Sequence, residues 1–390
     1  MRRLLAVVCL VGLVAAACGG DGGQTQQESE EQQDPIVIGY VGDFSDVYSF
    51  YDLPVRDGAQ FAVDEINADG GVLGRELQLV ARDGRNDQAE TVQLVEEMLS
   101  EGVNYIIGTT GDPFVAEALV ACGMNVPIST GDGTAPTLVA DAGECAYQLV
   151  MSDNVQGAVA AQYAYDQGHR NAFMLRSKEI PYTGNLPTYF KQSFENLGGS
   201  VQGEEQYRID AGDYSAQVTA IANLAPQPDV IFTPMFIPDT PVFMRQLRAA
   251  GVDIPVISTD GNHDASLLDA GRAVEGMVFT THALPQPDTE LADLFTRYEE
   301  ETGEAPSSVV VGIGYDEIYY LKQAIEDAGS AEPQALIDAL GRVEGFQGVT
   351  GEITMDPATR RAQKPVTLVE VKGGELSYVD QFYPEFVPEP

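Results

Sequence analysis

The sequence predicts an α/β protein with two successive lobes, each built around a largely parallel sheet. Short runs of β-branched and apolar residues, typical of strands buried on both faces, alternate with segments of helical periodicity. This alternation covers residues 36–150 and then starts again. Repeated strand–helix units imply parallel strands joined by right-handed crossovers. A chain of 390 residues is also long enough for two ordinary domains.

The first lobe is predicted from repeated strand–helix units. Its strands are expected at 36–41, 77–81, 105–107 and 126–129, and its first helix at 54–67. Asp87 and Glu90 resemble a capping box for a helix that runs to Ser100. Asp112 can cap the next helix, and Pro113 suits its first turn because the missing N–H costs nothing there.

The second lobe is predicted from the same alternation after residue 150. Strands are expected at 171–175, 229–232, 254–258 and 276–281, and helices at 153–167, 185–197, from 213 onward and at 241–250. Later helices at 289–301 and 309–328 must return to one of the two lobes. The tail, residues 350–382, changes to a period of two around Gly373 and Gly374, which predicts a hairpin.

Two neighbouring strands of the first lobe end in small polar turns. Tyr105–Ile107 leads into Gly108–Gly111, and Val126–Ser129 leads into Thr130–Thr134. In an open α/β sheet, ligands bind outside the carboxyl ends of the strands. We therefore expect a binding site at this edge of the sheet.

Composition and motifs exclude several classes of function. The chain has 60 acidic and 21 basic residues, a net charge of -39. Such a chain offers no basic surface for phosphates, so neither nucleic acid nor anionic lipid is expected as a partner. The sequence has no Gly-rich phosphate fingerprint, P-loop, nucleophile elbow or His-Glu-x-x-His motif. No cofactor and no metal are predicted, and an enzyme that uses Asp260 and His263 as an acid–base pair is kept only as an alternative.

The N-terminus has the form of an export signal. Arg2 and Arg3 precede an apolar run, Leu4–Ala17, which is short for a membrane span. The run ends in three alanines before Cys18 and resembles a bacterial lipobox, although Ala15 replaces the usual Leu. We therefore predict a signal peptide over residues 1–18, a lipidated Cys18 as the membrane anchor, and a disordered tether over residues 19–35. An ordinary secretory signal with a chance cysteine is the alternative.

Two cysteines, Cys122 and Cys145, lie outside the N-terminal segment. In an oxidising compartment such a pair usually forms a disulfide. A metal site is the alternative, but the sequence has no Cys-x-x-Cys and no histidine near these residues.

An ordered set of motifs resembles the leucine/isoleucine/valine-binding family, the type I solute-binding proteins of ABC importers. The segments that carry the resemblance are Ile36–Gly42, Asp64–Gly74, Tyr105–Gly108, Val126–Ser129, Met244–Gly251 and Val274–Met277. The resemblance covers nearly all of residues 36–382. It also suits a disulfide between Cys122 and Cys145.

The resemblance implies two doubly wound α/β lobes, of the periplasmic-binding-protein type I kind, joined by a three-strand hinge. The first lobe would comprise residues 36–150 and 284–346, and the second residues 151–281 and 350–383, with crossings near 150, 282 and 348. The implied function is capture of a small solute outside the cytoplasm and delivery to the permease and ATPase of an ABC importer. A ligand-sensing receptor lobe of the same fold is the alternative.

The family's ligand contacts correspond to loops at the strand ends of this chain. By resemblance Asp112 takes a position that meets a ligand carboxylate, and Asp260 takes the position that pairs with a ligand ammonium. The full set of expected ligand-binding residues is Phe44, Tyr51, Thr110, Gly111, Asp112, Asp132, Gly133, Thr134, Tyr182, Phe236 and Asp260.

Two of these aspartates depart from the family pattern. Asp112 and Asp132 would place negative charge where a ligand carboxylate rests, which favours a ligand with an amine or amide group. Each also has a purely structural interpretation. Asp112 can serve as a helix cap, and Asp132 can stabilise a tight turn before Gly133.

Overall fold

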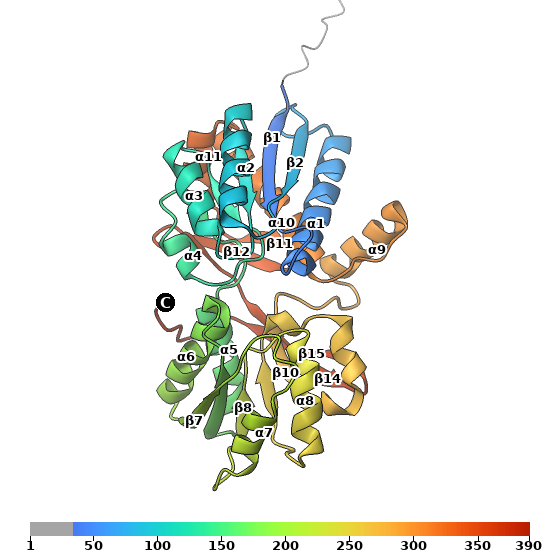
Figure 1. The fold of residues 1–390 in the computed structure, drawn as a ribbon. Helices are drawn as coiled ribbons and strands as arrows, with labels where there is room; N and C mark the ends of the chain where they lie inside the picture. The colour runs from blue at the N-terminus through green and yellow to red at the C-terminus, as the bar shows by residue number, and fades with distance from the viewer. Residues whose placement is uncertain (1–33) are drawn as a thin grey trace, which may run out of the picture. The chain divides into compact units, whose positions relative to one another are not determined.

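The computed structural model describes residues 34–390, which form a two-lobed α/β structure (Figure 1). The predicted signal peptide with its lipidated Cys18 lies outside the described residues, as does the predicted tether up to residue 33. Within the described part, no helix has both the length and the apolar character of a membrane span.

The sheet of the first lobe has, within residues 34–390, five strands that all run parallel. In spatial order they are β2 (Leu77–Asp83), β1 (Ile36–Gly42), β3 (Tyr105–Gly108), β4 (Ile128–Thr130) and β5 (Ala146–Tyr147). The order reverses between β1 and β3, so the loops after these two strands diverge and leave a crevice at the carboxyl edge.

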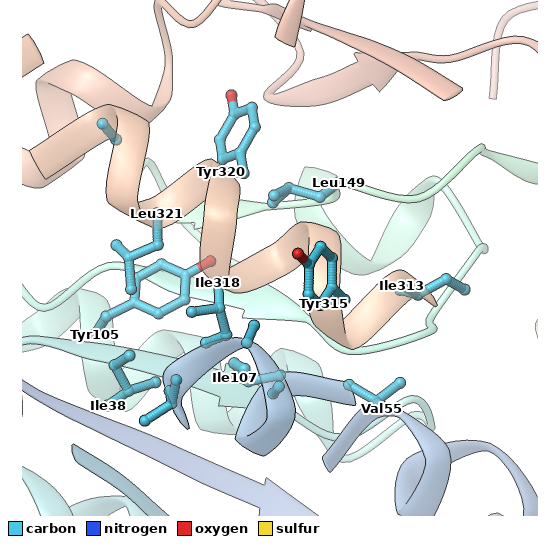
Figure 2. Packing of buried hydrophobic residues seen from close by; sticks show 14 of the residues in the cluster. Ile38, Val55, Tyr105, Ile107, Leu149, Ile313, Tyr315, Ile318, Tyr320 and Leu321 are labelled. Carbon is cyan, nitrogen blue, oxygen red and sulfur yellow. The ribbon is translucent and has the colours of Figure 1, made fainter. Parts of the chain in front are cut away.

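Helices cover both faces of this sheet. One face packs on α1 (Ser49–Ala68), α9 (Glu290–Thr302), α10 (Val310–Ala328) and α11 (Pro333–Leu340), and the other on α2 (Gln88–Glu101), α3 (Phe114–Gly123) and α4 (Thr137–Ala140). Tyr105 and Ile107 point to the first face and Ile106 to the second, as strand alternation requires. Figure 2 shows the first of these cores, where α10 packs against Tyr105 and Ile107.

Helices α1 and α10 approach closely because each presents a glycine to the other. A Cβ at Gly58 would lie 1.9 Å from the carbonyl oxygen of Val311, and one at Gly314 would lie 1.9 Å from that of Val55. Larger residues at these positions would force the helices apart. This contact holds the N-terminal part of α10 against the N-terminal half of α1.

The second lobe has a seven-stranded sheet within the described residues. Its spatial order is β15 (Glu375–Phe382), β14 (Val366–Lys372), β10 (Val278–Thr281), β9 (Val256–Ser258), β8 (Val230–Phe232), β6 (Asn171–Arg176) and β7 (Ser200–Gln206). The strands from β7 to β10 are parallel, whereas β14 and β15 are antiparallel. Lys372 pairs with Glu375 across the Gly373–Gly374 turn, which confirms the predicted hairpin at this point.

The second sheet is also covered on both faces. Its helices are α5 (Asp153–Asp166), α6 (Pro181–Asn196), α7 (Ser215–Ala222) and α8 (Asp239–Ala249), with 3₁₀ turns η1 (Asp260–Asn262) and η2 (Ala265–Ala273). Ala172 and Met174 face one core, and Phe173 and Leu175 face the other. The predicted doubly wound architecture in two lobes is confirmed.

The tail differs from the sequence prediction before residue 366. A small antiparallel sheet of β11 (Phe346–Gly348), β12 (Gly351–Asp356) and β13 (Arg361–Gln363) precedes the hairpin. Ile353, Met355 and Ala362 pack in the core of the first lobe, so the assignment of residues 350–363 to the second lobe is wrong. Both hairpins have a period of two, and this pattern does not specify which lobe a hairpin joins.

The chain passes between the lobes at three places, between β5 and α5, between β10 and α9, and between β13 and β14. The last passage therefore lies near residue 365 rather than near 348. Cys122, in the last turn of α3, forms the predicted disulfide with Cys145, just before β5. The alternative of a metal site at these cysteines is thereby wrong.

Candidate ligand-binding site

The strand-end loops of the two lobes meet around a cavity of about 610 Å³, part of which is open to solvent. Its walls come from the loops after β3 and β4 and the start of α1 in the first lobe, and from α6 and the loops after β8 and β9 in the second. The lining residues are Tyr48, Tyr51, Thr110, Gly111, Asp112, Asp132, Thr134, Ala135, Leu138, Ile180, Pro181, Tyr182, Phe236, Asp260 and Gly261.

Most of the residues predicted from the sequence lie on this cavity, but Phe44 and Gly133 do not. Phe44 turns inward and packs edge-on against Tyr40, with ring centroids 5.3 Å apart. Gly133 serves the turn itself, since its carbonyl accepts hydrogen bonds from the side chains of Thr130 and Gln148 at 3.0 and 2.7 Å. The structure therefore places neither of these two predicted ligand-binding residues on the cavity wall.

Several lining residues were missed by the sequence analysis. Tyr48 precedes α1, which begins at Ser49 rather than at residue 54 as predicted. Pro181 begins α6 directly after Ile180, whereas a helix was expected only from residue 185. Proline at a first helical position was the available signal for this start.

A buried carboxylate, Asp52, holds the first-lobe loops in place. It accepts a hydrogen bond from the Asp43 N–H at 2.7 Å and from the Thr110 hydroxyl at 2.5 Å. Burial raises the pKa of Asp52 to about 7, even though these hydrogen bonds favour its charged form. The Thr110 hydroxyl in turn accepts the Asp132 N–H at 3.1 Å, so Asp52 indirectly fixes the loop that carries Asp132.

Asp112 does not cap α3, contrary to one interpretation of the sequence. The helix begins at Phe114 after Pro113, and among the described residues no side chain caps its N-terminus. Asp112 is exposed and lies on the wall of the cavity. Its carboxylate therefore adds negative charge at the mouth of the cavity.

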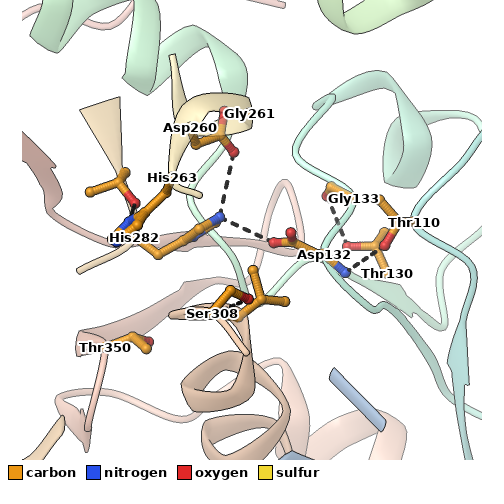
Figure 3. Close-up of polar contacts among 12 residues, drawn as sticks. Thr110, Thr130, Asp132, Gly133, Asp260, Gly261, His263, His282, Ser308 and Thr350 are labelled. Carbon is orange, nitrogen blue, oxygen red and sulfur yellow. Dashed lines mark hydrogen bonds and ion pairs between the residues drawn. The ribbon is translucent and has the colours of Figure 1, made fainter. Parts of the chain in front are cut away.

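Asp132 is buried and pairs with a histidine that the sequence analysis did not select. Its Oδ1 lies 3.1 Å from Nε2 of His282, and Asp260 Oδ2 lies 3.5 Å from the same nitrogen (Figure 3). Asp132 belongs to the first lobe and Asp260 to the second, and His282 directly follows β10. The side chain of Asp132 thus forms an ion pair rather than a local turn contact.

Asp260 is also held by Tyr182. The Tyr182 hydroxyl lies 2.7 Å from Asp260 Oδ1 and 2.6 Å from the Thr259 hydroxyl. Phe236 packs edge-on against Tyr182, with ring centroids 6.2 Å apart. The predicted carboxylate and aromatic walls of the second lobe therefore meet in one cluster.

His263 does not form an acid–base pair with Asp260. Its Nδ1 lies 2.5 Å from the Thr281 hydroxyl, and its ring packs edge-on against Phe279. Burial, with the charge of His282 nearby, lowers the pKa of His263 to about 4. The residue is half-buried in the loop after β9.

A cavity between two α/β lobes, with loops from both lobes on its walls, defines a two-lobed solute-binding protein. Residues 35–375 match the periplasmic binding protein family, and the chain belongs to this family. The resemblance to the leucine/isoleucine/valine-binding proteins is confirmed. Members of this family are substrate-binding proteins rather than enzymes.

Individual relatives resemble the chain at moderate identity. A leucine-, isoleucine-, valine-, threonine- and alanine-binding protein of Pseudomonas aeruginosa is 24% identical over 325 residues, which are 83% of this chain and 86% of the relative. The crystal structure of a leucine-binding protein from Thermotoga maritima has a TM-score of 0.79 and 27% identity, covering 90% and 99% of the two chains.

A solute-binding protein of Rhodopseudomonas palustris, solved with p-hydroxybenzoic acid, has the same TM-score of 0.79 at 23% identity, covering 91% of this chain and 98% of that one. At this identity the similarity shows the fold alone. Proteins with closely similar folds thus have names that refer to quite different ligands, so the cavity itself must be used to infer the ligand.

Proposed function

We propose that this chain is an extracytoplasmic lipoprotein that captures a small, amino-acid-like solute with an amine or amide group and delivers it to an ABC importer. Family membership supports binding of a small molecule and association with an ABC transporter. Capture of this kind requires only that the closed protein binds the ligand more tightly than the open one.

The residues of the cavity wall support the proposed ligand class. Asp112, Asp132 and Asp260 line the cavity, and within the described part of the chain no Lys or Arg lies on its wall. Buried charge requires an opposite charge or hydrogen bonds, so this wall favours a donor such as an ammonium over an anion. The faces of Tyr48, Tyr51, Tyr182 and Phe236 also suit a cation.

A free carboxylate on the ligand would encounter repulsion at this wall. Leucine and p-hydroxybenzoic acid, named for two similar proteins, both carry a carboxylate. Asp112 and Asp132 would repel such a group by an amount that depends on local screening. We therefore expect an amine or amino amide to bind more tightly than the corresponding amino acid.

Calorimetry with paired amino acids, amino amides and simple amines tests the ligand class. We expect the amides and amines to bind, and Asp260→Asn to weaken their binding by at least about 30-fold because truncating one member of a buried charge pair costs roughly 2–5 kcal/mol. Asp253→Asn, an exposed aspartate of the same lobe, is the matched control and should leave the affinity unchanged. A dicarboxylate that binds tightly would contradict the proposal.

The anchor is tested separately by membrane fractionation. Cys18→Ala should release the chain into the soluble fraction, because each acyl chain contributes roughly 0.8 kcal/mol per buried CH₂. A mutant that stays with the membrane would contradict lipidation at Cys18. Delivery is tested by measuring solute uptake in cells that lack the chain, after complementation with wild type or, as the control, with Cys18→Ala.

A further inference from the structure

His282 occupies a position that joins the two halves of the site. Its backbone follows β10, and its carbonyl accepts a hydrogen bond from the Thr367 hydroxyl at 3.3 Å, which ties it to β14. The side chain is only 1% exposed, and its Nε2 lies between Asp132 and Asp260 (Figure 3). One nitrogen therefore contacts a buried carboxylate from each lobe.

These two carboxylates need a positive charge. Asp132 and Asp260 are 5% and 10% exposed at the side chain, so water screens them poorly. Burial raises the pKa of Asp132, and the charge and hydrogen bond of His282 oppose this shift and favour the carboxylate. Burial lowers the pKa of His282, but the charges and hydrogen bonds of Asp132 and Asp260 outweigh burial and raise it to about 9. The imidazole is therefore protonated at neutral pH and serves as their counter-ion.

The other titratable groups around His282 do not replace this charge. His263 has its pKa lowered to about 4 and is neutral. Burial raises the pKa of Asp153, on α5, well above its ordinary value, which favours the neutral acid. Lys364 contacts Asp316 and Thr350, with its Nζ 3.9 Å from the Asp316 carboxylate and 2.5 Å from the Thr350 hydroxyl, and its charge acts on Asp132 without a direct contact.

We propose that His282 sets the ligand charge that the cavity accepts. Its positive charge offsets one of the two negative charges of Asp132 and Asp260, so that one net negative charge remains. The inference rests on the proposed function and narrows its ligand class. A ligand with a single ammonium and no carboxylate restores neutrality in the buried part of the site. A dication would leave an excess positive charge there, and a zwitterion would leave the negative charge uncompensated.

Histidine titration by NMR on the full chain tests the counter-ion without any ligand. The chain has three histidines, and His282→Gln assigns the signal of interest. We expect the His282 imidazole to stay protonated from pH 6 to 8 and to titrate near pH 9, and Asp132→Asn to lower the midpoint by about one unit or more. A midpoint at or below the ordinary value near 6.5 would overturn the inference.

Three probes of nearly equal size test the ligand charge: norleucine as a zwitterion, norleucinamide as a monocation and ornithinamide as a dication. Wild type should bind norleucinamide most tightly at pH 7. In His282→Gln, the ratio of ornithinamide Kd to norleucinamide Kd should fall at least about tenfold, because the site then carries two negative charges. His169→Gln, a histidine outside the cavity wall, is the matched control and should keep the wild-type ratio.

The two tests separate the inference from the proposed function. If wild type binds none of the three probes, the proposed amine class is contradicted, and the NMR midpoint alone decides whether His282 is the counter-ion. If the probes bind but the Kd ratio is the same in wild type and His282→Gln, the inference fails and the proposed function stands.

Discussion

The two lobes hold their halves of the cavity in different ways. In the first lobe, the loops with Thr110 and Asp132 are positioned by Asp52, a buried side chain that does not line the cavity. In the second lobe, Tyr182 and Asp260 position one another, and both line the cavity. The first-lobe half of the cavity is therefore held by a residue outside its wall, whereas the second-lobe half is held by residues on the wall itself.

This difference predicts where mutations separate stability from binding. A change behind the first-lobe loops should affect the stability of the lobe without removing any group from the cavity wall. A change in the second-lobe cluster should affect the ligand contact and its support at the same time. The predictions below test this contrast, from the largest expected effect to the smallest.

The disulfide should give the largest effect, confined to the first lobe. Cys122 and Cys145 are 23 residues apart, and closing a loop of this size in the unfolded chain is worth about 3 kcal/mol. The double substitution to alanine should lower the free energy of unfolding by about this amount in denaturant titrations. Hydrogen exchange should become faster in β4 and β5 but not in β8 and β9. An equal increase of the exchange rate in both lobes would argue against an effect confined to the first lobe.

Asp52→Asn should cost about 2 kcal/mol of stability. Both carboxylate oxygens of Asp52 accept hydrogen bonds, from Asp43 and Thr110, and the amide would turn a donor toward one of these donors. Thermal unfolding measures the loss. Asp64→Asn, at an exposed position on the same helix, is the control. A loss of ligand-binding free energy larger than the loss of unfolding free energy would contradict a supporting role.

The pH dependence of stability gives a related test. The pKa of Asp52 is about 7 in the folded chain and near 3.9 in an unfolded one, so the folded state binds the extra proton between these values. The stabilisation that comes from this extra proton is therefore fully present below about pH 4 and is lost as the pH rises to 7. Unfolding curves from pH 4 to 7 should show a shallower decline for Asp52→Asn than for wild type, and parallel slopes would contradict the raised pKa.

Tyr182→Phe should give the smallest effect but should act on binding. It removes the hydroxyl that contacts Asp260 and Thr259, a loss of about 1 kcal/mol. Calorimetry should show an amine ligand bound about fivefold more weakly. Tyr207→Phe, at a buried tyrosine of the same lobe outside the cavity wall, is the control. Equal effects of both variants on affinity would show that the Tyr182–Asp260 pair does not contribute to ligand binding.

The parts of the fold that the sequence predicted are those with a strong local signal. Buried strands such as β3 and β8 are continuous apolar runs, and Asp87 caps α2 through hydrogen bonds to the Ala89 and Glu90 N–H groups as predicted. Strand β7 was missed because most of its residues are exposed and it shows no apolar alternation. Its place at the sheet edge comes from pairing with β6, which no local pattern encodes.

The same distinction explains the site. Strand-end loops can be located along a sequence, so Asp112, Asp132 and Asp260 were all found on the cavity wall. His282 was not selected, because its role depends on two distant carboxylates that come together only when both lobes are folded. Phe44 lies in a strand-end loop as well, but its side chain turns toward Tyr40, and loop position alone does not specify that direction.

The order of the elements along the chain also constrains how the protein can be made. Helices α10 and α11, which complete the core of the first lobe, follow the parallel strands of the second, and β14 and β15 come last. A nascent chain that ends at Thr281 still lacks the α10 surface that covers Tyr105 and Ile107. Neither lobe can bury its core until most of the chain has left the ribosome. Unlike domains that fold one after another during synthesis, these lobes must mature together and late.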